Sequence, residues 1–406
     1  MFLLTVISFF LGFYFRENSA GGGTIDFAHE WHNYNLLKNN IWSFISGDYE
    51  ASRFPLYHII NIKINPFINS KADFLISFFL YSFILCILFF ISLKVYLKHN
   101  NNYIILLLSS ILLLSPYFRT SSYWGLQENL PYIFLLSSII AFELNKEKKV
   151  LITLLSFLCF YSDQKFAFVP LIFFIHYLNF PQIISKENFK LLFLNIFLFI
   201  PAVIIFYKWG GITKSETASG INEFSFSFQN ILFSLNIVFF YLLPFYMLKK
   251  NILLEFKTLI HKPQLTLIFF FVIVYFFIRY FFLDTNLPIS GGWAFKIFLA
   301  LKKINLFTSE IFYFLISFLS WIFVILYWSL IKYSQINKII FIFILLYGLF
   351  IEIIFQEYFD PLLIILAIFF FQKKDLQLIN FKKSLFLYFY FLVFWLGSLF
   401  YYKLIL

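Results

Sequence analysis

The residues best suited to chemistry lie in one polar segment near the start of the chain, residues 16–73. Its first part reads GTIDFAHEWHNY and carries Asp26 and Glu30. Its second part reads GDYEASRFPLYH and carries Asp48 and Arg53. A carboxylate can take a proton from a reacting hydroxyl group, and the fork of an arginine can hold a phosphate by two parallel hydrogen bonds. The segment therefore predicts chemistry outside the apolar part of the chain.

Three later polar segments stand between apolar runs: FRTSSYWGLQENLPY, FYSDQKFAF and FIEIIFQEYFDPLL. They contribute further cations and acids. The candidates for binding an anionic phosphate are Arg53, Arg119 and Lys165. The alternative is that the arginines pair with nearby acids for purely structural reasons, and the sequence leaves both interpretations open.

Two histidines beside the early acids raise the question of a metal. His29 and His32 are three residues apart, so both can face one side of a helix. A catalytic zinc needs a third protein ligand and a water, and Glu30 falls on a different face of such a helix. The favoured interpretation is an interfacial helix with Trp31 at the level of the lipid headgroups. A divalent metal stays open as the alternative, and no other cofactor is predicted.

The elements that must position these residues are apolar helices. The chain is 62% hydrophobic and its mean hydropathy is +0.85, far above the values of soluble domains. Runs long enough to cross a membrane recur throughout, which predicts an all-α polytopic membrane protein with about 11–13 transmembrane helices. After a short first span over residues 1–15, the predicted spans are 74–93, 103–117, 130–144, 150–162, 166–178, 191–207, 228–248, 264–283, 309–331, 338–353, 361–372 and 384–402. Cys86 and Cys159 both lie in apolar runs and are expected to be small buried hydrophobes.

Charge distribution orients these spans. Alternating them sorts the loops into a lysine-rich, acid-poor set and a set in which acids and bases nearly balance. The positive-inside rule places the lysine-rich loops in the cytoplasm, so the N-terminus is inside and the 16–73 loop is outside. The net charge of +11 is then a feature of topology and of contact with anionic membrane lipids. No nucleic-acid partner is expected.

Two further features complete the predicted organisation. The whole chain, 1–406, is expected to be a single transmembrane domain, with 16–73 as its extracytoplasmic catalytic loop. The segment 284–308 has an apolar face opposite Lys296, Lys302 and Lys303. This pattern predicts an amphipathic segment lying on the outer surface of the membrane. The alternative is a simple surface connector.

The order of these features resembles the GT-C superfamily of integral membrane glycosyltransferases, which includes the protein O-mannosyltransferases and the lipid A aminoarabinose transferases. A short first span is followed by an outer loop with an early acid, here Asp26, and by Arg53-Phe54-Pro55-Leu56-Tyr57, which resembles the family's Pro-Pro-Leu-Tyr element. Glu128 in QENLPYIF and Asp360 in EYFDPLL resemble features of some bacterial members. Each motif is loose: Phe54 replaces a proline, and Asp163-Gln164-Lys165 replaces an Arg-Gln pair.

The resemblance implies a sugar donor linked to a polyprenyl phosphate. It implies that an acid of the first outer loop removes the proton of the acceptor hydroxyl. Asp26 fits this role better than Asp48, because it lies 29 residues before Pro55 and leaves room for an interfacial helix. The catalytic candidates are Asp26, Glu30 and Asp48. The substrate-binding candidates are Tyr57, Trp124, Glu128, Asp163, Gln164 and Asp360. Some relatives bind a divalent metal at the first-loop acid.

The expected activity is therefore transfer of a sugar to a lipid, glycan or protein acceptor on the outer face of the cytoplasmic membrane, as part of cell-envelope glycan synthesis. Two alternatives remain. One is a polysaccharide polymerase or an enzyme similar to the O-antigen ligases. The other is a flippase or transporter for a lipid-linked glycan, although the predicted spans carry few charges and show no inverted repeat, which counts against transport.

Overall fold

The structure is a computed structural model, and every regular element in the residues it describes is a helix. The described residues are 1–46, 49, 53–98, 101–178, 185–212, 228–248, 270, 272–274, 292–303, 309–330, 354–370 and 379–404. The chain divides into two compact units, the first made of residues 1–219 and 391–404 and the second of residues 220–390. The predicted all-helical class is confirmed for the described part of the chain.

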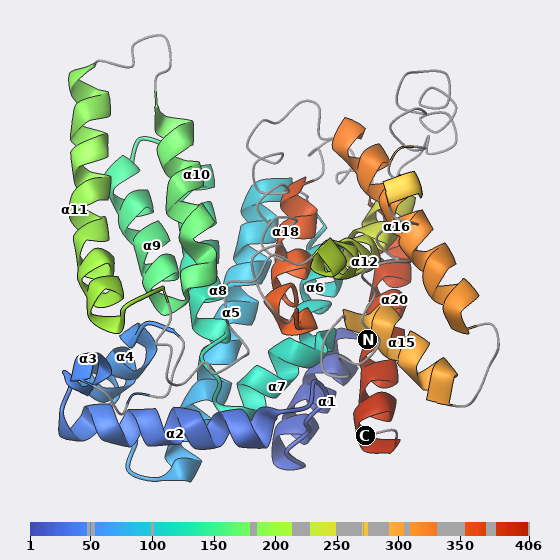
Figure 1. Cartoon of the computed structure of the whole chain (residues 1–406), viewed down its shortest axis with the longest axis horizontal. Coiled ribbons are helices and arrows are strands. Elements are labelled where there is room, and N and C mark those ends of the chain that lie inside the picture. Colours follow the sequence, from blue (N-terminus) through green and yellow to red (C-terminus); the bar gives the residue numbers. More distant parts are fainter. Residues whose placement is uncertain are drawn as a thin grey trace. The chain divides into compact units, whose positions relative to one another are not determined.

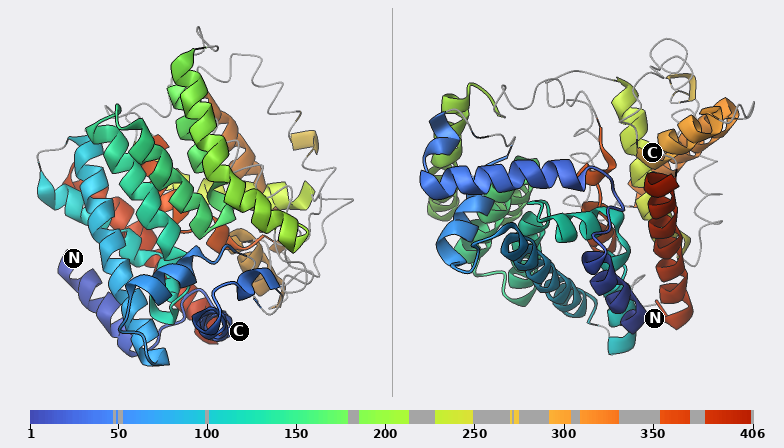
Figure 2. Two further views of the ribbon diagram at one scale, coloured as in Figure 1. Left: turned by 90° about the vertical axis from the view of Figure 1, so that its left-hand side faces the viewer. Right: turned by 90° about the horizontal axis from the view of Figure 1, so that it is seen from below.

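The first unit is built around long helices that run alongside one another. Its elements are α1 (Phe2–Tyr14), α2 (Gly23–Asn39), α3 (Ser43–Ser46), α4 (Leu56–Ile64), α5 (Lys71–Leu97), α6 (Asn102–Ser109), the 3₁₀ turn η1 (Leu112–Leu114), α7 (Pro116–Trp124), α8 (Asn129–Leu144), α9 (Lys149–Ser162), the 3₁₀ turn η2 (Gln164–Ala167), α10 (Phe168–Tyr177), α11 (Lys186–Trp209) and the last part of α20 (Phe381–Leu404). Helices α5, α8, α9, α10 and α11 stand side by side, and α2 crosses beneath their lower ends (Figure 1). The view from below shows α2 lying across this end of the unit (Figure 2).

Local capping explains where the helices of the first polar segment and of α5 begin. Ser70 caps α5 and forms a reciprocal capping box with Asp73, which satisfies backbone donors at the helix start. Helix α2 begins after Gly22, whose φ of 74° is in the left-handed region that glycine tolerates. The polar segment 16–73 is therefore largely helical, and its short helices lie at one end of the longer ones.

One predicted span is broken in the structure. The sequence predicts a single helix over 103–117, whereas α6 with η1 ends at Leu114 and α7 leaves at an angle of 68°. The break lies at Ser115, whose side chain caps the new helix, and at Pro116, which supplies no backbone N–H and fits the first helical position. Residues 118–124, expected in an outer loop, are thus helical and buried.

The second unit contains α12 (Phe228–Met247), α15 (Gly292–Lys303), α16 (Ser309–Leu330), the 3₁₀ turn η6 (Gln356–Tyr358), α18 (Leu362–Phe370) and residues 381–390 of α20. Helix α12 contacts α15, α16 and α18. Helix α15 lies within the predicted amphipathic segment 284–308, and the rest of that segment falls outside the described residues. So do the predicted spans 264–283 and 338–353, apart from residues 270 and 272–274.

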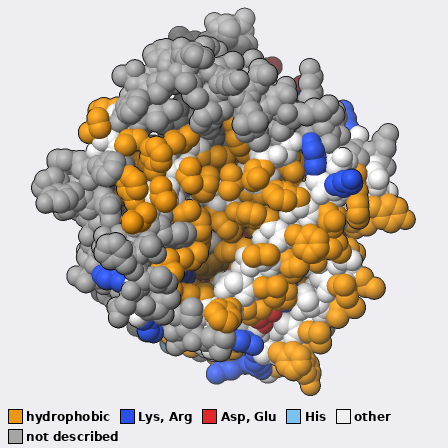
Figure 3. Space-filling model, turned by 90° about the vertical axis from the view of Figure 1, so that its right-hand side faces the viewer, with side chains coloured by type: hydrophobic (Ala, Val, Ile, Leu, Met, Phe, Trp, Pro, Cys, Tyr) orange, Lys and Arg blue, Asp and Glu red, His pale blue; other side chains and the backbone are white. Residues whose placement is uncertain are grey.

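Among the described residues, three helices are long and apolar enough to cross a membrane: α5, α11 and α20, with the bent pair α6–α7 as a fourth candidate. In α11, only 11% of the most apolar stretch is buried inside the protein. An exposed apolar surface of this kind is compatible with contact with lipid or with a partner protein. One face of the molecule likewise presents mainly apolar side chains among its described residues, with Lys and Arg near its edge (Figure 3). The apolar helices are compatible with insertion in a membrane, and the total of 11–13 spans stays a prediction.

Candidate functional site

Four charged side chains from distant parts of the chain meet at one end of the first unit. Arg53 precedes α4, Glu128 precedes α8, Asp163 follows α9 and Lys165 lies in η2. Each therefore stands at a helix end, where the chain turns and polar side chains can reach one another. We call Arg53, Glu128, Asp163 and Lys165 the charged cluster.

Arg53 joins the members of the charged cluster. Its Nη1 donates to Oε1 of Glu128, and its Nε lies 3.4 Å from Oδ2 of Asp163. The Lys165 ammonium is 3.3 Å from the same Asp163 oxygen. The side chains of Arg53 and Glu128 are 17% and 14% exposed, and those of Asp163 and Lys165 are 6% and 5% exposed. The cluster is thus mostly buried, and Arg53 and Glu128 are its more exposed members.

The neighbouring backbone fixes these side chains. Asp163 caps η2, because its Oδ1 accepts from the backbone N–H of Lys165 at 3.0 Å. The Ser121 hydroxyl donates to Oε2 of Glu128 at 3.2 Å. Gly125 ends α7 with a φ of 65°, and its carbonyl accepts a hydrogen bond from the hydroxyl of Tyr57. A Cβ at Gly125 would lie 3.0 Å from the Phe74 ring, so this turn requires glycine for conformation and for space.

Phe54 anchors Arg53 from the other side. Its ring packs on Phe206 and Trp209 at centroid distances of 5.2 and 5.8 Å, in a core cluster that also includes Phe44 and Phe160. Its backbone N–H donates to Oε1 of Gln164 at 3.3 Å. The aromatic residue that replaces a proline in the Pro-Leu-Tyr element therefore holds Arg53 beside Glu128. Gln164 also donates to the carbonyl of Ile212 at 3.3 Å.

The cluster keeps Glu128 ionised. Burial opposes the charge of this carboxylate, but the attraction of Arg53 and Lys165 and the hydrogen bond from Arg53 outweigh it. The pKa of Glu128 consequently lies below its ordinary value. Two cations thus balance the two carboxylates of Glu128 and Asp163. Such an arrangement can reorganise around an incoming phosphate, which would compete with the carboxylates for the guanidinium and ammonium groups.

A second polar pair lies close to the charged cluster. Oε2 of Glu30, on α2, is 3.1 Å from Nε2 of His58, on α4. The His58 side chain is 0% exposed and that of Glu30 is 10% exposed. Burial and the charges of both Glu30 and Glu128 raise the pKa of Tyr57 well above its ordinary value, with Arg53 opposing them. Glu30 and the charged cluster therefore both affect the pKa of the same tyrosine, Tyr57, and lie in one region.

Several buried polar atoms in this region have no hydrogen-bond partner among the described residues. They are Oε2 of Glu30, both ring nitrogens of His58, Oδ1 of Asn61, Oε1 of Gln127, Oδ2 of Asp163 and Nζ of Lys165. Folded proteins leave few such atoms, and each asks for an explanation such as a bound polar molecule. Oδ2 of Asp163 and Nζ of Lys165 nevertheless form an ion pair with each other, and Oδ2 of Asp163 also pairs with Arg53. A ligand rich in hydroxyl groups or phosphate oxygens would offer hydrogen-bond partners to the atoms of the charged cluster.

The other first-loop candidates lie differently. Asp26 is on the first turn of α2 and is exposed, as are His29 and His32. Asp48 falls outside the described residues. Among those described, no group of three or more His, Cys, Asp or Glu side chains is arranged to hold a metal ion. The two histidines therefore gain no support as metal ligands from the described part of the chain.

Arg119 is fully buried, and its contact partners differ from those of Arg53. Its Nε and Nη2 donate to the two carboxylate oxygens of Glu17 at 2.8 and 2.7 Å. Nη1 donates to the carbonyl of Leu113 at 3.1 Å, and Nη2 donates to the carbonyl of Ser8 at 2.9 Å. The guanidinium also stacks 4.2 Å from the ring of Trp395. These contacts fit the structural alternative for Arg119, and they leave Arg53 and Lys165 as the better-placed phosphate candidates.

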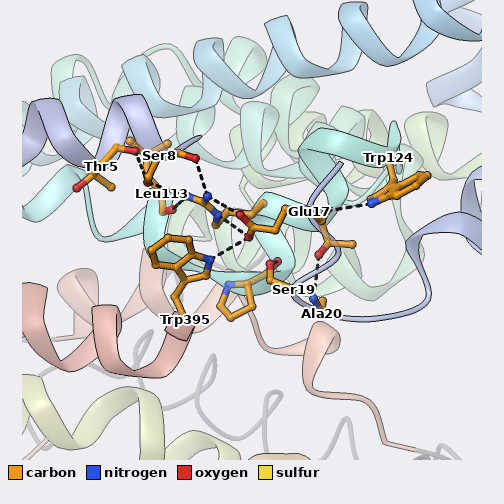
Figure 4. Close-up of polar contacts among 11 residues, drawn as sticks. Thr5, Ser8, Glu17, Ser19, Ala20, Leu113, Trp124 and Trp395 are labelled. Carbon is orange, nitrogen blue, oxygen red and sulfur yellow. Dashed lines mark hydrogen bonds and ion pairs between the residues drawn. The ribbon is translucent and has the colours of Figure 1, made fainter. Parts of the chain in front are cut away.

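Glu17 is the centre of that arrangement, which we call the Glu17 clamp: Glu17, Arg119, Trp124 and Trp395. Trp395 donates to Oε1 of Glu17 at 2.9 Å, and Trp124 donates to the Glu17 carbonyl at 3.0 Å (Figure 4). Trp124, predicted as a substrate residue, is thus buried with its N–H directed to Glu17. Nearby, the hydroxyl of Ser19 donates to the carbonyl of Pro116 at 3.0 Å, and the backbone N–H of Ala20 donates to Thr120 at 2.9 Å.

Asp360 belongs to the second unit. It is 1% exposed and precedes Pro361 through a cis peptide bond. Close by in sequence, the Gln356 amide donates to the hydroxyl of Tyr241 at 3.0 Å. Burial lowers the pKa of Lys296, on α15 of the same unit, to about 8, while the charge of Glu357 opposes the shift. Asp360 and Lys296 thus both belong to the second unit.

Sequence reasoning missed Glu17 and His58. Glu17 follows the first apolar run after one residue, Arg16, and such a position is ordinarily read as the solvated end of a span. His58 stands in LYHIINI, and a helix over these residues would place it on the same face as Asn61, three residues later. That shared face was the available signal for burial of His58. Comparisons with models of known protein families, with curated proteins and with solved structures find no match to this chain.

Proposed function

We propose that this chain is an integral membrane glycosyltransferase that moves a sugar from a polyprenyl-phosphate donor to a lipid, glycan or protein acceptor. In this proposal the chain is a polytopic helical bundle of the GT-C type in the cytoplasmic membrane, with the N-terminus inside and the 16–73 segment outside. The observation that carries the proposal is the charged cluster, which is mostly buried, stands at the ends of apolar helices and includes two ion-paired atoms that have no hydrogen-bond partner among the described residues.

The residues divide the chemistry as follows. Arg53 and Lys165 would hold the donor phosphate and stabilise the negative charge that develops as it departs. Glu128, Asp163 and Gln164 would orient these cations and the sugar hydroxyls. An acid of the first polar segment, Asp26 or Glu30 among the described candidates, would take the proton of the acceptor hydroxyl. The apolar faces of helices such as α11 would accommodate the polyprenyl tail in the lipid.

The transfer itself balances without a further reactant. The acceptor hydroxyl loses its proton to the carboxylate, and its oxygen forms a bond to the anomeric carbon of the sugar. The bond between that carbon and the phosphate oxygen breaks, and its electron pair leaves with the polyprenyl phosphate. A site that offers two cations to a phosphate and a carboxylate to a hydroxyl matches these demands.

A strain that lacks the gene tests the proposal. We expect its membranes to accumulate the sugar-loaded polyprenyl phosphate and its envelope to lose one glycan, as measured by mass spectrometry. Wild type should restore the glycan. Glu128→Gln should not, whereas Glu187→Gln, the same change at a side chain that is 84% exposed, should restore it. Asp26→Asn tests the first-loop base in the same way.

Two outcomes would overturn the proposal. Full restoration of the glycan by Glu128→Gln would show that the transfer does not require the charged cluster. Accumulation of the donor only on the cytoplasmic side of the membrane would indicate a flippase instead.

A further inference from the structure

The buried contact between Glu30 and His58 joins α2 and α4, two helices of the first polar segment that pack on each other. The two atoms, Oε2 and Nε2, are 3.1 Å apart, although the geometry does not meet that of a hydrogen bond. Nδ1 of His58 also has no hydrogen-bond partner among the described residues. The pair therefore holds polar atoms that the described fold itself does not satisfy.

Aromatic rings enclose His58. The ring of Tyr57 meets it edge-on at 4.9 Å, and the ring of Tyr49 does so at 6.1 Å. With 0% exposure, the imidazole has no access to solvent. Burying an imidazole against a carboxylate removes both from water, and a hydrophobic pair of similar volume commonly stabilises a fold as well or better. A structural role alone is therefore a weak explanation for this pair.

The exposures of the two side chains differ in an informative way. Glu30 is 10% exposed, whereas His58 is wholly enclosed. Glu30 therefore keeps some surface that a bound molecule can contact, whereas His58 has none. The charges of Glu30, Glu128 and Arg53 all act on the hydroxyl of Tyr57, which places Glu30 in the same region as the groups that would bind the phosphate.

A base that takes a proton in a transition state must be held in a fixed orientation. Asp26 lies one turn earlier on α2 and is exposed. Glu30 is buried where α2 packs on α4, and its Oε2 lies 3.1 Å from Nε2 of His58. Its carboxylate thus meets the requirement for a positioned base more closely.

We infer that His58 is a positioning residue that orients the Glu30 carboxylate as the base of the proposed sugar transfer. This inference rests on the proposed function and deepens it. Glu30 receives the proton of the acceptor hydroxyl while the acceptor oxygen bonds to the anomeric carbon, and the phosphate departs with the electron pair of the broken bond. His58 touches neither donor nor acceptor and acts only through Glu30.

A double-mutant cycle tests the inference with membranes of the deletion strain, which contain the accumulated donor lipid. The full-length protein is added, and consumption of the donor is followed per molecule of protein. The cycle consists of wild type, Glu30→Gln, His58→Leu and the double variant. We expect Glu30→Gln to slow consumption at least about 100-fold, as for loss of a general base. His58→Leu should slow it about tenfold, and the double variant should match Glu30→Gln, because the two act as one unit.

His58→Gln provides the conservative comparison, because its amide can still donate toward Glu30. It should retain more activity than His58→Leu at equal protein concentration, with the assay temperature well below the thermal unfolding midpoint of each variant. A purely structural role of His58 would instead make the two single effects multiply in the double variant. Should His58→Leu fail to fold, the cycle is built with His58→Gln and the same criterion applies.

The outcomes separate the two ideas. The inference is overturned if the losses of activity of the two single variants multiply in the double variant. It is also overturned if the folded His58 variants keep the activity of wild type. Retained activity in Glu30→Gln also overturns it, while loss of activity in Glu128→Gln would leave the proposed function standing. Failure of wild type to consume the donor overturns the proposed function and the inference together.

Discussion

Replacing Glu17 by glutamine should destabilise the protein far more than the same change at an exposed glutamate. The Glu17 carboxylate accepts from Arg119 at 2.8 and 2.7 Å and from Trp395 at 2.9 Å. Arg119 is 0% exposed, so its charge would remain buried without a counter-ion. Breaking a buried pair in this way costs about 3–5 kcal/mol, and we expect the lower part of that range because the glutamine oxygen keeps one acceptor.

The measurement is the free energy of unfolding in detergent micelles, followed by circular dichroism. Glu187→Gln is the matched control, because Glu187 is 84% exposed and pairs with Lys149 at 3.5 Å. An exposed pair contributes about 0–1 kcal/mol. The double variant Glu17→Gln with Arg119→Met should recover part of the loss, since it also removes the buried charge. If Glu17→Gln costs no more than Glu187→Gln, the reasoning about the Glu17 clamp is wrong.

Two further predictions concern other parts of the chain. The pKa of Lys296 is about 8 in the folded protein, against an ordinary value of 10.5, so between these values the unfolded chain binds more protons and the free energy of unfolding rises with pH. Lys296→Met should therefore raise the thermal unfolding midpoint most at pH 7 and least near pH 10. An equal effect at both pH values would contradict this. Tyr57→Phe leaves the carbonyl of Gly125 without its hydrogen bond and should cost about 1–3 kcal/mol of unfolding free energy, whereas Tyr14→Phe at an exposed site should cost almost nothing.

Helices were predictable from the sequence because apolar runs set their length. The run predicted over 74–93 is α5, Lys71–Leu97, and the run predicted over 191–207 is α11, Lys186–Trp209. The ends were less predictable, since polar caps such as Ser70 and Ser185 extend a helix beyond its apolar part. The bend at Pro116 was missed because the apolar pattern continues up to it.

The residues of the candidate site could be picked out from the sequence by their type, but the contacts between them could not be predicted. Arg53, Glu128 and Asp163 were each singled out, but no spacing along the chain indicates that one arginine joins both acids across 75 and 110 residues. The pairing of Arg119 with Glu17 was equally hidden, because it depends on how α7 packs against α1. Such contacts arise from tertiary packing, which local patterns do not encode.

The Glu17 clamp also bears on the order in which the protein is completed during synthesis. Glu17 is made early, yet Trp395 follows it by 378 residues, and Ser398 donates to the carbonyl of Ser19 from 379 residues away. The ribosome must therefore finish nearly the whole chain before these contacts can close. Until then the first unit lacks the part of α20 that belongs to it, and Glu17 and Ser19 lack these two contacts.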